Sequence, residues 1–175
     1  MAHLRLATES DAPTIARIYV ETWRDSYPGM LPDDVLVRLS PDRQSRSWRH
    51  AVRDPSQAVL VADELTAGVV GFGSCGASRH RNLPFSGEVY TLYVSGDHQR
   101  RGVGRQLILS LLATLRERGH DSAVVWALAD NPSRFFYEAM GGSLVAEGED
   151  VLWGVPIRQR AYGWRDLSEW LSTIR

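Results

Sequence analysis

The chain has 175 residues, with 20 basic and 21 acidic side chains and a formal net charge of -1, a balance that predicts one compact domain over residues 1–175 and argues against a general nucleic-acid binder. Hydrophobic residues make up 43% of the sequence and charged residues 23%, which excludes collagen, a coiled coil and a wholly disordered chain. Cys75 is the single cysteine, so an intramolecular disulfide and a cysteine-based zinc site are excluded.

The basic residues are all arginine. A catalytic lysine, a Schiff base and a phosphate-binding P-loop lysine are therefore excluded. No uninterrupted apolar run approaches the roughly 20 residues of a membrane helix, and the five histidines show no metal-ligand spacing. We therefore expect a cytoplasmic protein with no membrane partner, no nucleic-acid partner and no bound metal.

The first half of the chain predicts a strand, several helices and a hairpin. Ser10, Asp11 and Pro13 are typical of a helix start, and an apolar periodicity then continues to Trp23. The expected elements are a strand at 4–6, this helix, shorter helices after Asp33 and from Pro41, and hairpin strands at 58–62 and 69–75.

The second half alternates strands and helices. The expected elements are a strand at 88–94, a helix through Leu107–Leu115 ending at Gly119, a strand at 123–128, and a helix opening at Pro132 and closing at Gly141. Late strands are expected at 144–146, 152–155 and 158–164, separated by 147–150 and Pro156, with a short helix at 167–171. This order favours an α/β fold, α+β by stricter taxonomy, with a mixed sheet and helices on both faces.

The stretch Gln99–Arg105 is the most informative part of the sequence, because it follows an expected strand and opens the strongest predicted helix. Its glycines let the backbone approach a ligand closely, and a helix start attracts anions through its unpaired N–H groups and its dipole. Its arginines add charge-assisted donors suited to phosphate oxygens. The glycines are Gly102 and Gly104, and the arginines are Arg100, Arg101 and Arg105.

A pyrophosphate fits such a stretch, and an ordinary glycine turn with solvated arginines is the alternative. Two common nucleotide motifs do not match. The P-loop sequence GK[ST] is missing, and Leu107 stands where the dinucleotide motif G-x-G-x-x-G requires its third glycine.

The run Gln99-Arg100-Arg101-Gly102-Val103-Gly104 resembles the pyrophosphate loop of the GNAT superfamily of acyl-CoA-dependent N-acyltransferases, which reads Q/R-x-x-G-x-G/A after a central strand. A second family motif, an Asn followed by a helix with F-Y-E and a glycine, is similar to Asn131, Phe136-Tyr137-Glu138 and Gly141. The resemblance covers about the whole chain, with its specific part between Glu88 and Gly142. It implies a mostly antiparallel mixed sheet that splays between two central parallel strands.

The resemblance also implies that acetyl-CoA is the acyl donor. Its pantetheine arm would enter between the strands at 88–94 and 123–128, where free main-chain groups can pair with its two amides as a sheet edge does. For Arg134, where the family often has a small residue, a surface ion pair is the alternative. The residues so assigned to the cofactor are Leu92, Tyr93, Val94, Gln99, Arg100, Arg101, Gly102, Val103, Gly104, Arg105, Asn131, Arg134 and Tyr137.

Two residues are candidates for catalysis by the same resemblance. Tyr137 matches a tyrosine that donates a proton to the departing thiolate, and its alternative role is an aromatic core residue. Glu88 is the candidate general base, acting directly or through a water, and its alternative is a carboxylate in solvent or paired with an arginine.

The acceptor site is expected from the first helices and the late-strand loop. Trp23, Arg24 and Tyr27 are assigned to the acceptor on this basis, together with Tyr90, although Trp23 can equally be a core residue. Glu149 and Asp150 either form a solvated turn or face the acceptor, where they would favour cationic amines.

These expectations lead to three functional hypotheses. The first is an N-acetyltransferase that moves an acetyl group from acetyl-CoA to a primary amine of a small molecule by direct attack in a ternary complex. The alternatives are a peptide or protein N-acetyltransferase and a non-catalytic acyl-CoA-binding module. A homodimer is expected from the habit of the family.

Overall fold

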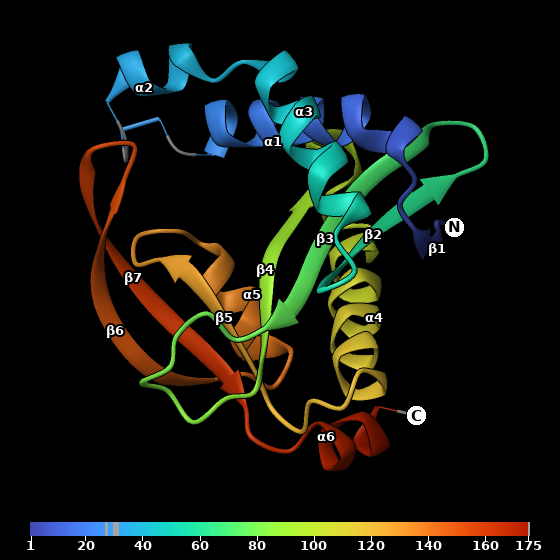
Figure 1. Cartoon of the computed structure of the whole chain (residues 1–175), viewed down its shortest axis with the longest axis vertical. Helices are drawn as coiled ribbons and strands as arrows, with labels where there is room; N and C mark the ends of the chain where they lie inside the picture. The colour runs from blue at the N-terminus through green and yellow to red at the C-terminus, as the bar shows by residue number, and fades with distance from the viewer. Residues whose placement is uncertain (27, 30–31, 175) are drawn as a thin grey trace. The chain divides into compact units, whose positions relative to one another are not determined.

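The computed structural model (Figure 1) describes residues 1–26, 28–29 and 32–174. The chain divides into two compact units. Unit 1 comprises Met1–Cys75 with Thr91–Leu111, and unit 2 comprises Gly76–Tyr90 with the chain from Leu112 onwards. The chain passes between the units within β3 (Gly68–Ala77), β4 (Gly87–Val94) and α4 (Val103–Glu117). The organisation as one domain stays a prediction.

Unit 1 begins with a short strand and three helices. In chain order, the elements before β3 are β1 (His3–Leu6), a 3-10 turn (Glu9–Asp11), α1 (Ala12–Ser26), α2 (Asp33–Arg38), α3 (Pro41–Arg53) and β2 (Gln57–Glu64). Strand β1 pairs antiparallel with β2, and the hydrogen-bonded order continues to β3 and β4. The expected strands and helices of the first half are therefore confirmed.

Helices cover both faces of the sheet in unit 1. On one face Ile15 and Ile18 of α1 and Trp48 of α3 form a buried cluster with Phe72 of β3, whose ring lies edge-on to Trp48 at 4.9 Å. On the other face the strand backbone at Gly73 is in close contact with Leu111 of α4. Burial of these apolar side chains is the main favourable contribution to the stability of this unit.

Unit 2 contains the remaining strands and helices. They are β5 (Ala123–Leu128), α5 (Ser133–Ala139), β6 (Ser143–Leu152), β7 (Val155–Trp164) and α6 (Leu167–Thr173). Strand β5 pairs parallel with β4 over Gly87–Val89, three of the eight residues of β4, whereas β5–β7 and β7–β6 are antiparallel. The mixed, mostly antiparallel sheet that we expected is confirmed. In the part of the chain that the structure describes, no helix has both the length and the apolar character to cross a membrane.

The late strands differ from the sequence prediction. We expected residues 147–150 to separate two short strands, but they lie inside β6, which pairs with β7 from Ser143 to Leu152 (Figure 1). The pairing is supported across the strands by an ion pair between Glu147 and Arg160 at 2.9 Å. The turn is instead at Trp153 and Gly154, which have φ angles of 49° and 79°. Two successive positive φ angles are typical of the tightest hairpin turns.

The contact between β3 and α4 predicts the effect of one added methyl group. A Cβ at Gly73 would lie 2.5 Å from Leu111 Cδ1 and 2.9 Å from the Thr91 carbonyl oxygen, so Gly73→Ala must displace backbone as well as a side chain. We expect the free energy of unfolding to fall by about 1–3 kcal/mol, measured by urea denaturation. Gly96→Ala is the control, because nothing lies within 4 Å of its Cβ position. Equal stability of the two variants would contradict this packing.

Candidate active site

The turn Gln99–Arg105 lies in unit 1, between a 3-10 turn at Gly96–His98 and the start of α4. Its backbone enters the left-handed region at Arg100, with φ 59°, and at Gly102, with φ 85°. Glycine adopts this conformation without steric cost, and a Cβ at Gly102 would have no heavy atom within 4 Å. The sequence therefore places an open stretch of backbone directly before the helix.

The start of α4 provides unpaired donors. The Gln106 N–H donates to the Gly102 carbonyl at 3.0 Å, which is the first hydrogen bond of the helical pattern. The N–H groups of Val103, Gly104 and Arg105 precede it and have no partner within the helix. Together with the positive end of the helix dipole, they favour an anion at this position.

Three arginine side chains add positive charge to the turn. Arg100, Arg101 and Arg105 are exposed, and in residues 1–26, 28–29 and 32–174 no acidic side chain pairs with them. Each guanidinium presents five N–H donors, and such donors bind phosphate oxygens in a bidentate manner. The donor set therefore fits the diphosphate of coenzyme A, which we expected at this turn.

The turn is held by contacts with β4 and β2. The Gln99 side chain, which we expected at the cofactor, donates from Nε2 to the Val94 carbonyl at 3.0 Å. His98 Nδ1 lies 2.9 Å from Ser95 Oγ, and its Nε2 lies 3.8 Å from a Glu64 carboxylate oxygen. These contacts fix the entrance of the turn, so its donors are positioned before any ligand binds.

The end of β4 packs the ring of Tyr93 against the core of unit 1. Leu92, Tyr93 and Val94 are half-buried. The Tyr93 ring lies 5.4 Å from Tyr19 and 5.5 Å from Phe72. The Tyr93 ring is therefore a packing group of unit 1, and any role of residues 92–94 toward a cofactor falls to their main-chain groups.

The residues of α1 that we assigned to an acceptor have structural contacts. Trp23 is 6% exposed and lies 6.0 Å from Tyr19, whose pKa burial raises to about 12. Arg24 donates to the carbonyl oxygens of Leu36 at 3.3 Å and Leu39 at 2.9 Å, and so stabilises the end of α2. Tyr27, the third residue of this set, lies outside the described residues.

Glu88 lies in unit 2 with its carboxylate almost completely buried, at 1% exposure. Its Oε1 accepts from Arg79 Nη2 at 2.8 Å and from Arg79 Nε at 3.3 Å, and its Oε2 accepts from the Arg79 main-chain N–H at 2.8 Å. One residue therefore supplies donors to both carboxylate oxygens. This is the arginine-paired arrangement that the sequence left open as an alternative to a free base.

Tyr90 is attached to the same loop. Its hydroxyl donates to the Ala77 carbonyl at 2.6 Å, and the Arg79 guanidinium lies 4.1 Å from the centre of its ring. The ring thus supports Arg79 by a cation–π contact. We assigned Tyr90 to the acceptor, and the structure shows in addition that it holds the start of the β3–β4 loop.

Sequence reasoning missed three residues around Glu88, namely Arg79, His80 and Trp126. The His80 ring packs at a tilt of 42° against Trp126, with 4.8 Å between the ring centres, and its Nε2 lies 3.8 Å from Glu88 Oε1. The alternation of side chains in a strand would have predicted that Arg79 and His80 lie near Glu88. These two residues belong to an irregular loop, where no such alternation exists. Only the closeness of a basic pair to a strand-borne acid in sequence could have pointed to them.

The second family motif forms α5 and its entrance. Asn131 Oδ1 accepts from the Ser133 N–H at 2.9 Å, which orients the residue at the helix start. Tyr137 is 6% exposed, and its ring stacks on Tyr162 of β7 at 6.1 Å. Arg134 stacks on the neighbouring Phe135 ring at 4.6 Å. The expected roles of Asn131, Arg134 and Tyr137 toward a cofactor stay predictions.

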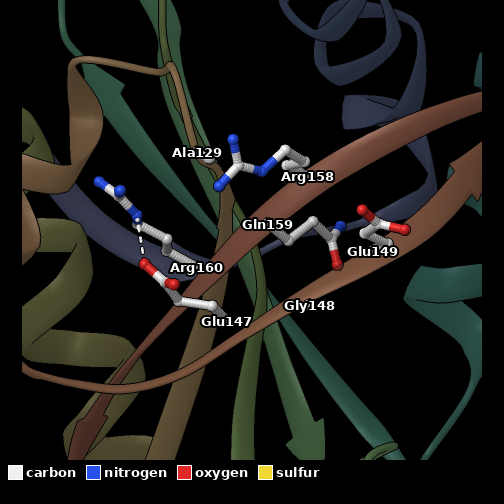
Figure 2. Close-up of a pocket in the computed structure, with 7 residues that line it drawn as sticks. All are labelled: Ala129, Glu147, Gly148, Glu149, Arg158, Gln159 and Arg160. Atoms are coloured by element: carbon white, nitrogen blue, oxygen red, sulfur yellow. Dashed lines mark hydrogen bonds and ion pairs between the residues drawn. The ribbon is translucent and has the colours of Figure 1, made fainter.

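The β6–β7 hairpin carries a cavity of about 220 Å³ (Figure 2). Figure 2 shows Arg160 directed toward Glu147, its ion-pair partner, and Arg158 reaching toward Ala129. Two arginines and two glutamates line the cavity, so its formal charges balance. Its lining residues are Ala129, Glu147, Gly148, Glu149, Arg158, Gln159 and Arg160. Asp150 accepts from the Val151 N–H at 2.7 Å.

Known proteins are similar to this chain over nearly its whole length. An N-acetyltransferase of Bacillus subtilis (strain 168), YuaI, named as uncharacterized, is 33% identical over 168 residues, which cover 96% of this chain and 95% of the relative. The phosphinothricin N-acetyltransferase of Streptomyces viridochromogenes is 32% identical over 175 residues, covering 95% and 85%.

A family model and a solved structure agree with these relatives. The family described as FR47-like protein matches residues 77–151. The structure of yncA from Salmonella typhimurium with its cofactor acetyl-CoA superimposes with a TM-score of 0.71 at 21% identity, covering 95% of this chain and 94% of that chain, and shares its fold. With the full-length similarity to named N-acetyltransferases, these findings place the chain in the GNAT superfamily of acetyl-CoA-dependent N-acetyltransferases.

Proposed function

We propose that this acetyltransferase acetylates the primary amine of a small molecule, which attacks the thioester of acetyl-CoA directly in a ternary complex. The observation that carries the proposal is the Gln99–Arg105 turn, where helix N–H groups lie beside three exposed arginines that have no acidic partner among the described residues, a donor set suited to a diphosphate. The match to the Streptomyces relative covers 95% of this chain, and the name of that relative gives phosphinothricin as its acceptor, which supports a small acceptor here. The cytoplasmic location and the homodimer stay predictions.

The chain's own residues divide the work as follows in this proposal. The N–H groups of Val103, Gly104 and Arg105 and the guanidinium groups of Arg100 and Arg101 bind the diphosphate and so hold the donor in place. Acetyl-CoA, when bound, supplies an activated acetyl group as a thioester. Tyr137 holds a proton on its hydroxyl for the sulfur that leaves, an assignment that follows from its place in the second family motif.

A panel of acceptors tests the acceptor class. We expect purified protein with acetyl-CoA to release free thiol with amino acids and small primary amines and to release little with peptides of five or more residues. Thiol release and mass spectrometry of the acetylated product measure both. A preference for peptides would favour the peptide alternative, and tight coenzyme A binding with no transfer to any amine would favour a non-catalytic module.

Charge reversal in the turn tests the diphosphate site. Hydrogen bonds to charged groups contribute about 1.5–3 kcal/mol each, so Arg100→Glu with Arg101→Glu should weaken coenzyme A binding on the order of 100-fold in calorimetry. Binding of S-acetylpantetheine, which has no diphosphate, should change little. Arg46→Glu with Arg49→Glu on α3 is the matched control, because it reverses two exposed arginines elsewhere in unit 1. Equal losses for both ligands would argue against diphosphate recognition.

Removal of one hydroxyl tests Tyr137 as the acid. Tyr137→Phe keeps the ring that stacks on Tyr162, so we expect kcat to fall by about 100-fold with KM for acetyl-CoA within about threefold, as befits a general acid. Steady-state kinetics measure both constants. Tyr162→Phe removes a hydroxyl from the buried stacking partner and should leave kcat nearly unchanged. A raised KM with a normal kcat in Tyr137→Phe would be incompatible with the acid role.

A further inference from the structure

We propose that His80 takes the proton from the acceptor's ammonium group and that Glu88, buried behind it, positions and stabilises the His80 ring. The inference rests on the proposed acetyl transfer and names a group that neither sequence motif contains. All of its residues lie in unit 2, on the β3–β4 loop, on β4 and on β5.

The transfer needs a base because amines are protonated at neutral pH. For an amine with an ordinary pKa of about 10.4, roughly one molecule in 2,500 is neutral at pH 7. A side chain that accepts the proton at the site therefore raises the reactive fraction. Histidine is the residue type whose ordinary pKa lies near neutral pH, which suits this task.

The contacts of Glu88 make it a poor direct acceptor of that proton. Its carboxylate is 1% exposed, and Arg79 donates to both of its oxygens. A ligand ammonium would have to displace the guanidinium and enter a buried position to reach it. Removing one partner of a buried ion pair leaves an uncompensated charge, which is strongly unfavourable.

His80 has the accessibility that Glu88 lacks. Its side chain is 34% exposed, its ring packs at a tilt against Trp126, and its main-chain N–H donates to Ser78 Oγ at 3.3 Å. Nε2 lies 3.8 Å from Glu88 Oε1. With Nε2 on the side of the carboxylate, Nδ1 is the ring nitrogen that remains for a ligand.

The surroundings of the ring contain a second feature that points to a ligand. The Trp126 Nε1–H is buried and has no acceptor among the described residues. His80 Nδ1 likewise has no hydrogen-bond partner among residues 1–26, 28–29 and 32–174. Two neighbouring rings thus each carry a nitrogen without a hydrogen-bond partner in the described part of the chain, an arrangement that a bound polar molecule would complete.

The charged groups that face His80 act in opposite directions. From β4, the Glu88 carboxylate favours the imidazolium, whereas the Arg79 guanidinium on the same loop opposes it. From β5, the facing group is the neutral indole of Trp126. Glu88 therefore places a negative charge behind the ring, and Arg79 donates to that carboxylate from its guanidinium and its main-chain N–H.

The acetyl transfer begins with the loss of a proton from the acceptor's ammonium group. An N–H bond of the ammonium breaks, its electron pair stays on nitrogen, and the proton binds His80 Nδ1. The nitrogen pair forms a bond to the thioester carbon, and the C–S bond breaks with its pair on sulfur. The sulfur takes a proton from Tyr137, which regains one from the acetylated nitrogen through solvent, and His80 releases its proton to solvent.

The test compares His80→Gln with Glu88→Gln, using the amine of the acceptor panel with the highest kcat/KM. His80→Gln should lower kcat/KM by about 100-fold and remove the fall of kcat/KM at low pH that a protonated base causes, with coenzyme A binding within twofold by calorimetry. Added imidazole should partly restore the rate of His80→Ala. His120→Gln, at a half-buried histidine of the same unit, is the matched control and should behave as the unmodified protein.

The role of Glu88 has a readout that does not depend on turnover. In Glu88→Gln the loss of the carboxylate should move the pH midpoint of the His80 ring signals in NMR to lower pH, and the low-pH limb of kcat/KM should move with it. An unchanged pH profile in His80→Gln, with the low-pH limb lost in Glu88→Gln, would overturn the inference in favour of Glu88 as the base. If the unmodified protein releases no thiol with any amine, the proposed function fails and the inference fails with it.

Discussion

The position of α4 depends on the absence of side chains at Gly71 and Gly73 of β3. A Cβ at Gly71 would lie 3.0 Å from the Tyr93 carbonyl oxygen and 3.1 Å from Leu107 Cδ1, so the helix packs directly on the strand backbone. Leu107 and Leu111 are completely buried in this contact. Because the first turn of α4 carries the unpaired N–H groups, the packing of its next two turns determines where these donors point. The direction of these donors is therefore a property of the core as much as of the turn.

Arginine has three different roles in this lysine-free chain. At the Gln99–Arg105 turn it remains exposed and unpaired by acids, at Arg24 it donates to helix-end carbonyls, and at Arg79 it neutralises the buried Glu88. The planar fork of donors allows the last two roles, since the Arg24 side chain reaches two carbonyl oxygens and the Arg79 side chain donates twice to one oxygen of Glu88. The consequence at Glu88 is that both oxygens of a buried carboxylate accept hydrogen bonds from one residue.

Local patterns predicted the elements and the turn, but they did not predict long-range side-chain contacts. Residues 123–128 were predicted with the observed bounds, because a buried β-branched run is a local signal. The turn Gln99–Arg105 was also found, since its glycines and its helix start are adjacent in sequence. Residues 147–150 were misplaced because polar side chains on an edge strand have no apolar alternation to reveal it. His80 was missed because its partners come from β4 and β5, and an irregular loop carries no periodicity that aligns it with them.

The use of arginine as the only basic residue type also affects how readily this protein is acylated by its own acyl donor. A thioester acylates any neutral amine nearby, and a surface lysine is the side chain that most often provides one. Guanidinium groups stay protonated at all physiological pH values and are poor nucleophiles. Because the basic residues of this chain are all arginine, no side chain offers an amine for such self-acylation, and the positive charge of the exposed Arg100, Arg101 and Arg105 is not lost by this route.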